Sequence, residues 1–489
     1  MKLYYVGHDC LFAVEQMMFT VFPGEKPEYP EGEPVLTENT AIVTVSQAGE
    51  DITAETVLCR NGGTWTGTRN ATLAGDELER RRILQHTVRL CFYDAAVGCL
   101  GKEPPWGALT GVRPVKLPTR DMLGGKTRDE AGAHLRDYFR VSPSRAELAL
   151  DCAEASLNAR ASLKEDEISL YIGIPFCPTR CAYCSFISAD RKGAAKLIAP
   201  YLDALCREVE EAGKMLRSVG KFVKTIYIGG GTPTTLSEEQ LTRLMDTVRT
   251  SIDLSRCVEY TVEAGRPDTI TPEKLAVIKE YGGGRVSVNP QTMRDEVLHA
   301  MGRAHDAQAI RDAWELVKQS GIPVTNMDLI AGLPKDDFDG FKASLDEVIE
   351  MNPANITVHT LALKKSAALY QARPVLPSGE EVAAMLDYAW ETLAAHGYVP
   401  YYLYRQKYMS GSFENVGWCK PGTENLYNIC MMEELHSVLS LGAGGITKLT
   451  DGSGKLSRLN NPKYAVEYLS AFDAVLADKE TAAEYFRSH

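Results

Sequence analysis

Six short runs of apolar and β-branched residues recur through the middle of the chain and predict six buried strands. They span 168–174, 225–229, 259–264, 284–289, 324–330 and 356–361. Helical periodicity fills most of the intervals between them. Strands that alternate with helices pair in parallel, so these segments predict βα units. Six units are too few for a closed eight-fold barrel. They favour an open, partial (β/α)6 barrel of the TIM type, whose ligands gather at the carboxyl ends of the strands.

The pattern on either side of these units differs, and it predicts two further domains. Residues 1–165 show β-like runs at 41–45 and 55–59, then helical stretches from 73 to 100 and from 142 to about 163, which indicate an α/β domain. We place the barrel at 166–365. Residues 366–489 form a mixed C-terminal segment, with a helix over 378–396, a Tyr-rich run at 401–404 and a Gly-rich turn at 442–445.

Composition and charge narrow the class of protein. The 489 residues are 44% hydrophobic and 24% charged, which is typical of globular chains. The formal net charge of −12 argues against sequence-independent binding to nucleic acid or anionic lipid. The first residues are too polar for a signal peptide, and no run reaches the roughly 18 apolar residues of a membrane span. We therefore expect a cytoplasmic protein without membrane insertion, in which an anionic substrate meets local positive charge.

Three of the twelve cysteines stand in a C-x3-C-x2-C spacing directly after the first predicted strand. These are Cys177, Cys181 and Cys184, and the other nine are scattered without a disulfide framework. Three thiolates at this spacing suit a cubane iron–sulfur cluster with one iron left open for a small molecule. A zinc knuckle is the alternative, although structural zinc usually takes four ligands in paired C-x2-C units.

A glycine triplet ends the second predicted strand, in the sequence from Gly229 to Thr234. Three consecutive amides without side chains can hydrogen-bond the amino-acid portion of a cofactor. A tight turn is the simpler explanation of such a triplet taken alone. Its place one strand after the cysteines favours the cofactor.

The stretch from Tyr171 to Cys184 and the glycine triplet resemble the radical S-adenosylmethionine (SAM) superfamily. Within it, the sequence is most similar to the oxygen-independent coproporphyrinogen III dehydrogenase group and to its HemZ branch. Gln291, Gly302-Arg303 and the sequence 328–335 extend the resemblance over roughly 166–365. This group also contains haem chaperones and haem-acting methyltransferases. The resemblance implies a partial radical SAM barrel with SAM as a cofactor.

By this resemblance, the three cysteines bind a [4Fe-4S] cluster, and the amino and carboxylate groups of SAM chelate its fourth iron. The positions that match SAM-contacting residues are Tyr171, Phe176, Gly230, Gly231, Thr232, Glu263, Gln291, Arg303 and Asp328. The two aromatic residues would line the site near the cluster, and the glycine loop would bind the methionyl part. Glu263 would bond the ribose or amine, and the last three would contact ribose and carboxylate groups.

Some of these positions also have simpler explanations. Arg303 could be a cation on a helix surface, and Asp328 could be a cap or part of a salt bridge at a strand end. Glu263 is harder to explain in that way, because burying an unpaired carboxylate inside an apolar strand is costly.

A tetrapyrrole with several carboxylates needs cationic partners, which Arg and Lys supply through charge-assisted hydrogen bonds. The candidates are Arg266, Lys364, Lys365, Arg405 and Lys407. A second set could lie against the macrocycle or belong to a core strand: Tyr401, Tyr402, Tyr404 and Tyr408. Haem ligation by Cys419, His359 or His436 is a further alternative.

The resemblance implies that a 5′-deoxyadenosyl radical takes hydrogen from the propionates of coproporphyrinogen III, which become vinyl groups of protoporphyrinogen IX. A low-potential donor of the flavodoxin or ferredoxin type would supply the electron. Two positions depart from enzymes with this activity: Phe186 replaces a further cysteine, and Gly173 replaces a histidine. A haem-binding chaperone and a haem-modifying methyltransferase therefore remain as alternatives.

Overall fold

The computed structural model describes residues 1–184, 189–406, 413–452 and 454–489. It divides into two compact units, which are described separately. The first contains Met1–Leu150 and Arg405–Phe413, and the second contains Asp151–Tyr404 and Glu414–His489. No helix in the described ranges combines the length and the apolar character needed to cross a bilayer.

The first unit is built on a four-stranded sheet in the order β1-β2-β3-β4. Its strands are β1 (Lys2–Val6), β2 (Thr40–Ala48), β3 (Asp51–Arg60) and β4 (Gly63–Thr72). Helices α1 (Leu11–Val21) and α2 (Glu77–Leu100) share one apolar core with the sheet. The helical part that follows comprises α3 (Lys116–Leu123), α4 (Arg128–Ala133), η1 (His134–Tyr138) and the start of α5 (Pro143–Ala161). The predicted strands and the predicted helix over 73–100 are present.

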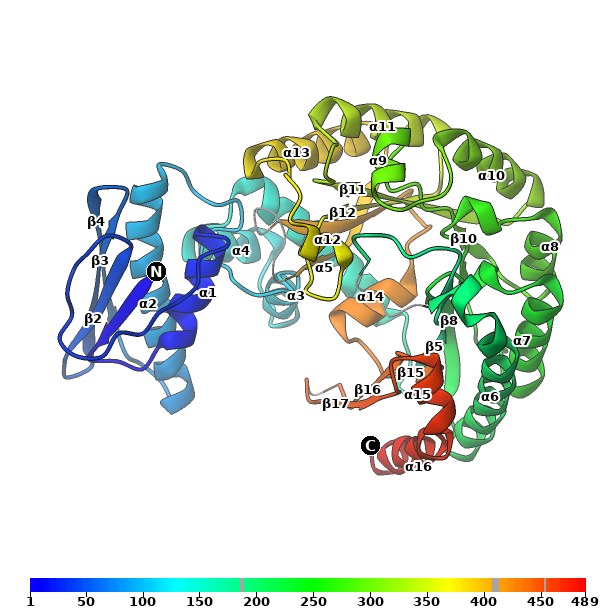
Figure 1. The fold of residues 1–489 in the computed structure, drawn as a ribbon. Coiled ribbons are helices and arrows are strands. Elements are labelled where there is room, and N and C mark those ends of the chain that lie inside the picture. Colours follow the sequence, from blue (N-terminus) through cyan, green and yellow to red (C-terminus); the bar gives the residue numbers. More distant parts are fainter. Residues whose placement is uncertain (185–188, 407–412, 453) are drawn as a thin grey trace. The chain divides into compact units, whose positions relative to one another are not determined.

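The second unit contains the predicted partial barrel (Figure 1). Six parallel strands stand side by side in chain order: β5 (Glu167–Ile174), β8 (Phe222–Gly230), β9 (Glu259–Glu263), β10 (Arg285–Ser287), β11 (Val324–Ala331) and β12 (Asn355–Thr360). The crossover helices lie outside the strands: α6 (Arg191–Ser218), α7 (Glu238–Ser251), α8 (Pro272–Glu280), α9 (Asp295–Ala300), α10 (Ala307–Ser320) and α11 (Phe338–Met351). The expected (β/α)6 architecture is confirmed.

The C-terminal segment extends this sheet at both edges, which the strand pattern did not predict. On one side β15 (Val438–Leu441) pairs in parallel with β5 and is followed by β16 (Ile446–Thr450) and β17 (Leu456–Asn460). On the other side β14 (Glu414–Cys419) pairs antiparallel with β12, and β13 (Val399–Arg405) lies beyond it. The sheet therefore has eleven strands over the described residues.

Five further helices follow β12 in the described part of the second unit. They are α12 (Ala368–Ala372), α13 (Gly379–Ala395), α14 (Leu426–Glu433), α15 (Ala465–Ser470) and α16 (Phe472–Ser488). The helix predicted over 378–396 matches α13, which Ser378 caps by accepting from the amide of Glu381.

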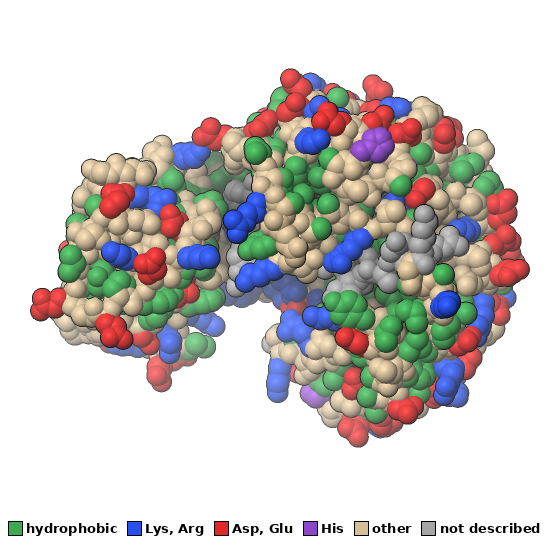
Figure 2. Space-filling model, viewed as in Figure 1, with side chains coloured by type: hydrophobic (Ala, Val, Ile, Leu, Met, Phe, Trp, Pro, Cys, Tyr) green, Lys and Arg blue, Asp and Glu red, His purple; other side chains and the backbone are tan. Residues whose placement is uncertain are grey.

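On the face shown in Figure 2, basic side chains are interspersed with acidic ones.

A buried ion pair fixes the C-terminal helices to α6. Glu208 is fully buried, and its carboxylate accepts from Lys479 Nζ at 2.7 Å and from the Tyr468 hydroxyl at 2.7 Å. The same carboxylate accepts from the amide of Gly442 at 2.7 Å. Within the described part of the chain, the hydrogen-bonding partners of this carboxylate come from the C-terminal segment, which therefore contributes to the stability of the barrel unit.

Replacing Lys479 with methionine should destabilise this unit by about 3–5 kcal/mol, because it leaves the Glu208 charge buried without its counter-ion. Urea unfolding followed by circular dichroism measures the change. Arg487→Met is the matched control, because Arg487 pairs with Glu480 on the same helix at 2.8 Å but is half exposed. That control should change stability by less than about 0.5 kcal/mol. Equal effects of the two substitutions would contradict the role given to the buried pair.

Candidate functional site

The loop after β5 presents the three cysteines at the carboxyl end of the barrel. Cys177, Cys181 and Cys184 are each partly exposed. The amide of Ala182 donates to the carbonyl of Met301 at 2.9 Å, which docks this cysteine loop on the segment between α9 and α10. The carbonyl of Ala182 accepts from the amide of Leu369 at 2.9 Å. Two remote segments therefore hold the middle of the loop.

The glycine loop after β8 supports the cysteine loop with its backbone. The amide of Gly231 donates to the carbonyl of Ile174 at 2.8 Å, and the amide of Thr232 donates to the carbonyl of Phe176 at 2.7 Å. The Thr232 hydroxyl lies 3.5 Å from Cys177 Sγ. The amide of Gly230 donates to Glu263 Oε2 at 3.2 Å. These three N–H groups are already bonded within the protein, so this loop would bind the methionyl part of SAM through its carbonyl groups.

Glycine at 231 is required by this close approach. A Cβ there would lie 2.5 Å from the carbonyl oxygen of Phe176 and 2.8 Å from that of Ile174, and both obstacles are backbone. The position therefore has a structural reason that is independent of any cofactor.

Gly231→Ala should displace the cysteine loop and lower the rate of reductive SAM cleavage by roughly a hundredfold, the effect of misplacing reacting groups by about 1 Å. Production of 5′-deoxyadenosine with dithionite as reductant measures it. Gly284→Ala is the matched control in the same barrel, because a Cβ at Gly284 would meet nothing within 4 Å. Similar rates for the two variants would show that the close approach is unimportant.

Glu263 ends β9 inside the barrel and is linked to two tyrosines. The Tyr227 hydroxyl donates a hydrogen bond to Glu263 Oε1. Tyr171 stacks on Tyr227 with ring centroids 6.3 Å apart, as expected for register partners on β5 and β8. Burial raises the pKa of Glu263 to about 7, and the nearby charge of Asp328 acts in the same direction. This carboxyl is therefore poised between its two protonation states near neutral pH.

Asp328 reaches the same lumen from β11. Its Oδ1 accepts from the side chain of Asn326 at 2.7 Å, and its Oδ2 lies 3.7 Å from His359 Nε2 on β12. Burial opposes ionisation of Asp328, but the contacts with His359 and Asn326 hold its pKa below the usual value. Gln291 lies alongside, because its amide donates to the carbonyl of Asp328 at 2.8 Å. The structure thus brings Glu263, Gln291 and Asp328 to one end of the barrel.

Arg303 is buried at 5% exposure rather than lying on a helix surface. Its Nη1 donates to the carbonyl of Asn289 at 2.6 Å, whereas its Nε has no hydrogen-bond partner in the described ranges. Two buried acceptors at the end of β10, Asn289 Oδ1 and Ser287 Oγ, are also without partners there. Unsatisfied buried polar atoms are costly, so this end of the barrel fits a polar ligand with both donors and acceptors.

The spacing of the cysteines favours a cluster over a single metal ion. Each cysteine of a cubane binds a different iron, whereas structural zinc usually takes four ligands in paired C-x2-C units. Within the described residues, no three His, Cys, Asp or Glu side chains are arranged to hold one ion.

Several other sequence candidates have different surroundings from those expected. The ring of Phe176 is fully buried and packs edge-to-face on Tyr201, so this residue contributes its carbonyl to the site. Arg266 is buried at 3% exposure beside the cysteine loop. Arg405 is buried and donates to the carbonyl of Leu109 at 2.5 Å. Neither arginine is presented to a large anionic substrate.

Two candidate cations remain at the surface. Lys364 and Lys365 are exposed just beyond β12. Lys407, Tyr408 and Phe186 lie outside the described residues.

Gly173, the position at which the resembling enzymes carry a histidine, is closely packed. A side chain there would meet the carbonyl oxygen of Ala443 at 2.9 Å.

The tyrosine-rich run belongs to the core, which supports the simpler explanation. Tyr401 and Tyr402 are 2% and 6% exposed and pack with Cys419. Cys419 is fully buried, and His436 is buried against the Ser169 hydroxyl at 2.7 Å. Neither is accessible to haem, whereas His359 faces the lumen.

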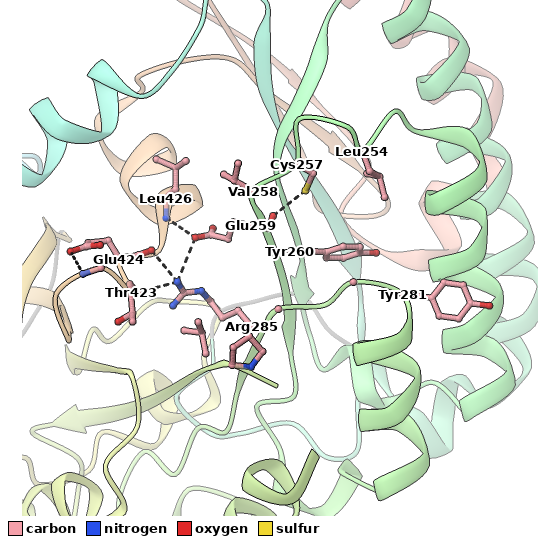
Figure 3. A pocket seen from close by; sticks show the side chains of 15 residues that line it. Leu254, Cys257, Val258, Glu259, Tyr260, Tyr281, Arg285, Thr423, Glu424 and Leu426 are labelled. Carbon is pink, nitrogen blue, oxygen red and sulfur yellow. Dashed lines mark hydrogen bonds and ion pairs between the residues drawn. The ribbon is translucent and has the colours of Figure 1, made fainter. Parts of the chain in front are cut away.

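A cavity of about 530 Å³ lies at the opposite end of the barrel, beside the first residues of β9, β10 and β11. Figure 3 shows Glu259 and Arg285 facing each other there, 3.6 Å apart, with Leu426 above them. The Arg285 guanidinium donates to the carbonyls of Thr423 and Glu424, so its polar groups join β10 to the segment before α14. We place the chemistry at the cysteine end, because the thiolates and the partnerless polar atoms are there.

Comparison with known proteins decides the family. The Radical SAM superfamily matches residues 171–348. The chain is 38% identical over 409 residues to the oxygen-independent coproporphyrinogen-III oxidase-like protein HemZ of Bacillus subtilis, and the match covers 82% of each chain. The chain belongs to this radical SAM family. Its cofactors are accordingly a [4Fe-4S] cluster and SAM.

Two further relatives of this radical SAM protein differ in what they do. The haem chaperone HemW of Escherichia coli is 28% identical over 62% of this chain and 75% of its own. The structure of coproporphyrinogen III oxidase (HemN) from Escherichia coli, a radical SAM enzyme, matches with a TM-score of 0.53 and 25% identity over 66% of this chain and 72% of that one. Both an enzyme and a chaperone are therefore similar to this chain.

Sequence reasoning missed Tyr227 and the partners of the cysteine loop. Tyr227 could have been found from strand alternation, because it has the same parity as Gly229 and lies opposite Tyr171 on the neighbouring strand. The partners of the cysteine loop, Met301 and Leu369, are far from it in the sequence, and no periodicity indicates their contacts.

Proposed function

We propose that this protein is a radical SAM oxidoreductase that converts propionates of coproporphyrinogen III into vinyl groups, giving protoporphyrinogen IX. The single observation that carries the proposal is the set formed by Glu263, Tyr227 and Asp328 beside the cysteine loop. A SAM-cleaving site needs such polar groups within reach of the cluster. Similarity to the coproporphyrinogen-III oxidase-like protein HemZ and to coproporphyrinogen III oxidase (HemN) supports the choice of substrate.

When bound, the cluster and SAM together supply a 5′-deoxyadenosyl radical that abstracts hydrogen. The three cysteines would hold the cluster. The carboxylate of Glu263 would accept from the amine or ribose of SAM, with Tyr227 fixing its orientation through their hydrogen bond. Arg303 Nε would donate to a carboxylate of SAM, since it is buried and lacks a partner in the described ranges. The tyrosine layer formed by Tyr171 and Tyr227 would restrict water in the lumen.

Anaerobic turnover tests the proposal. Reconstituted protein is incubated with SAM, dithionite and coproporphyrinogen III, and tetrapyrroles and carbon dioxide are quantified. We expect two carbon dioxide and two 5′-deoxyadenosine molecules for each protoporphyrinogen IX, because each vinyl group formed consumes one SAM and releases one electron to an acceptor. SAM cleavage without any loss of carbon dioxide from the tetrapyrrole would refute the substrate while leaving the radical SAM assignment in place. A flavodoxin or ferredoxin should replace dithionite as electron donor.

Haem binding without turnover is the second candidate, and one observation favours it. The carbonyl oxygen of Ala443 leaves no room for a side chain at Gly173, where the resembling dehydrogenases carry histidine. Of the three candidate haem ligands, Cys419, His359 and His436, the accessible one is His359, whose imidazole faces the lumen. A His359→Ala variant that loses haem binding, together with wild-type protein that produces no protoporphyrinogen, would establish the chaperone function instead.

A further inference from the structure

Arg266 joins two loops beside the cysteines. Its guanidinium bonds both oxygens of Asp268, from Nε at 3.1 Å and from Nη2 at 3.4 Å. It also donates to the carbonyl of Thr179 at 3.2 Å and to the Thr179 hydroxyl at 3.1 Å. Thr179 stands between the first two cysteines, so the arginine ties the cysteine loop to the segment after β9.

The same guanidinium lies against a cysteine sulfur. Arg266 Nη1 is 3.8 Å from Cys181 Sγ, within hydrogen-bonding range for sulfur. The Arg266 side chain is 4% exposed. Burial weakens screening by water and salt, so the charge acts on the sulfur more strongly than a surface charge would. Asp268, 29% exposed, balances part of that charge and lies 3.5 Å from His305 Nδ1.

A charged donor beside a cluster sulfur shifts the reduction potential of the cluster in one direction. Reduction adds one negative charge to a cluster, and hydrogen bonds to its sulfurs and nearby net charge set its potential. A positive N–H donor on a ligating thiolate stabilises the reduced form and raises the potential. A carboxylate near that donor has the opposite effect.

We propose that Arg266 raises the reduction potential of the cluster by donating to Cys181 Sγ, and that Asp268 holds the guanidinium in place and moderates its charge. The guanidinium thereby makes the cluster easier to reduce by a cellular electron donor, and the carboxylate limits this effect. Arg266 is then a positioning and tuning residue rather than the carboxylate-binding residue expected from the sequence. The inference rests on the radical SAM function proposed above, in which Cys181 binds the cluster.

Redox titration of the reconstituted full chain, followed by electron paramagnetic resonance, tests this inference. Arg266→Gln should reduce the ratio of reduced to oxidised cluster about tenfold at a fixed potential, a downward shift of about 59 mV for one electron. Asp268→Asn should shift the potential upward, because it removes the balancing charge. Opposite shifts distinguish tuning from simple loosening of the loop, which would move both variants in the same direction.

Arg256→Gln is the matched control, because Arg256 is an ion-paired arginine at the other end of β9, 2.7 Å from Asp166. It should leave the potential unchanged. If Arg266→Gln does not assemble a cluster, Arg266→Lys and Asp268→Asn decide the question. Lysine keeps the positive charge, so the potential of Arg266→Lys should lie less than half of that 59 mV shift below the wild-type potential. Unchanged potentials, or a downward shift in Asp268→Asn, would overturn the proposal. Failure to convert coproporphyrinogen would refute only the proposed substrate, because the potential is read from the cluster alone.

Discussion

Replacing Cys181 with alanine is expected to reduce reductive SAM cleavage to the uncatalysed background. Two thiolates cannot hold a cubane that depends on three, and without the cluster no electron reaches SAM. Cys181 occupies the middle of the cysteine loop, where Ala182 anchors the chain to Met301 and Arg266 approaches the sulfur. Iron and sulfide content and 5′-deoxyadenosine formation are measured after anaerobic reconstitution.

Cys59→Ala provides the matched control for this loss. Cys59 is also a partly exposed free thiol, but it lies on β3 of the first unit. Its replacement should leave the iron content and SAM cleavage as in the wild type. Retention of SAM cleavage in Cys181→Ala would contradict the assignment of the cluster to these three cysteines.

Glu263→Gln is expected to weaken SAM binding roughly 10- to 100-fold, corresponding to the 1.5–3 kcal/mol of a hydrogen bond to a charged group. The amide cannot supply the negative charge that would attract the amine of SAM. Burial raises the pKa of Glu263 to about 7, so the carboxylate is the major form above that pH and is lost below it. Wild-type affinity for SAM should therefore fall as the pH decreases from 8 to 6.

Isothermal titration of reconstituted protein with SAM across this pH range measures the effect. The affinity of Glu263→Gln should be nearly independent of pH, because the titrating group is absent. Tyr227→Phe is an informative companion, because it removes only the hydroxyl that bonds Glu263 Oε1 and should raise the pH at which affinity falls. Equal pH profiles in the wild type and Glu263→Gln would show that another group controls SAM binding.

The strands of the barrel could be predicted from sequence because a buried parallel strand is apolar along its whole length. The strand that the C-terminal segment adds beside β5 could not. Val438–Leu441 is only four residues long, and its partner Ile172 lies far away in the sequence. Helix α1 was missed for the opposite reason: Leu11–Val21 is apolar nearly throughout, so it lacks the alternation that marks an amphipathic helix.

The candidate site was predictable where chemistry demands a spacing, as in Cys177, Cys181 and Cys184. It was less predictable where tertiary contacts decide a role. Arg266 has the residue type expected for binding a carboxylate, but it is already bonded to Asp268 and Thr179. The glycine triplet indicated a loop beside the cysteines, but not that the amides of Gly231 and Thr232 donate to the cysteine loop. In both cases the partners come from other loops, which no local pattern reveals.

The most direct test of the open iron is the electron paramagnetic resonance spectrum of the reduced protein with and without SAM. If three cysteines hold the cluster and SAM chelates the fourth iron, adding SAM must change the g-values of the reduced cluster. Arg256→Gln should show the same change, whereas Glu263→Gln should require more SAM to produce it. A spectrum of the reduced wild-type cluster that saturating SAM leaves unaltered would contradict the account.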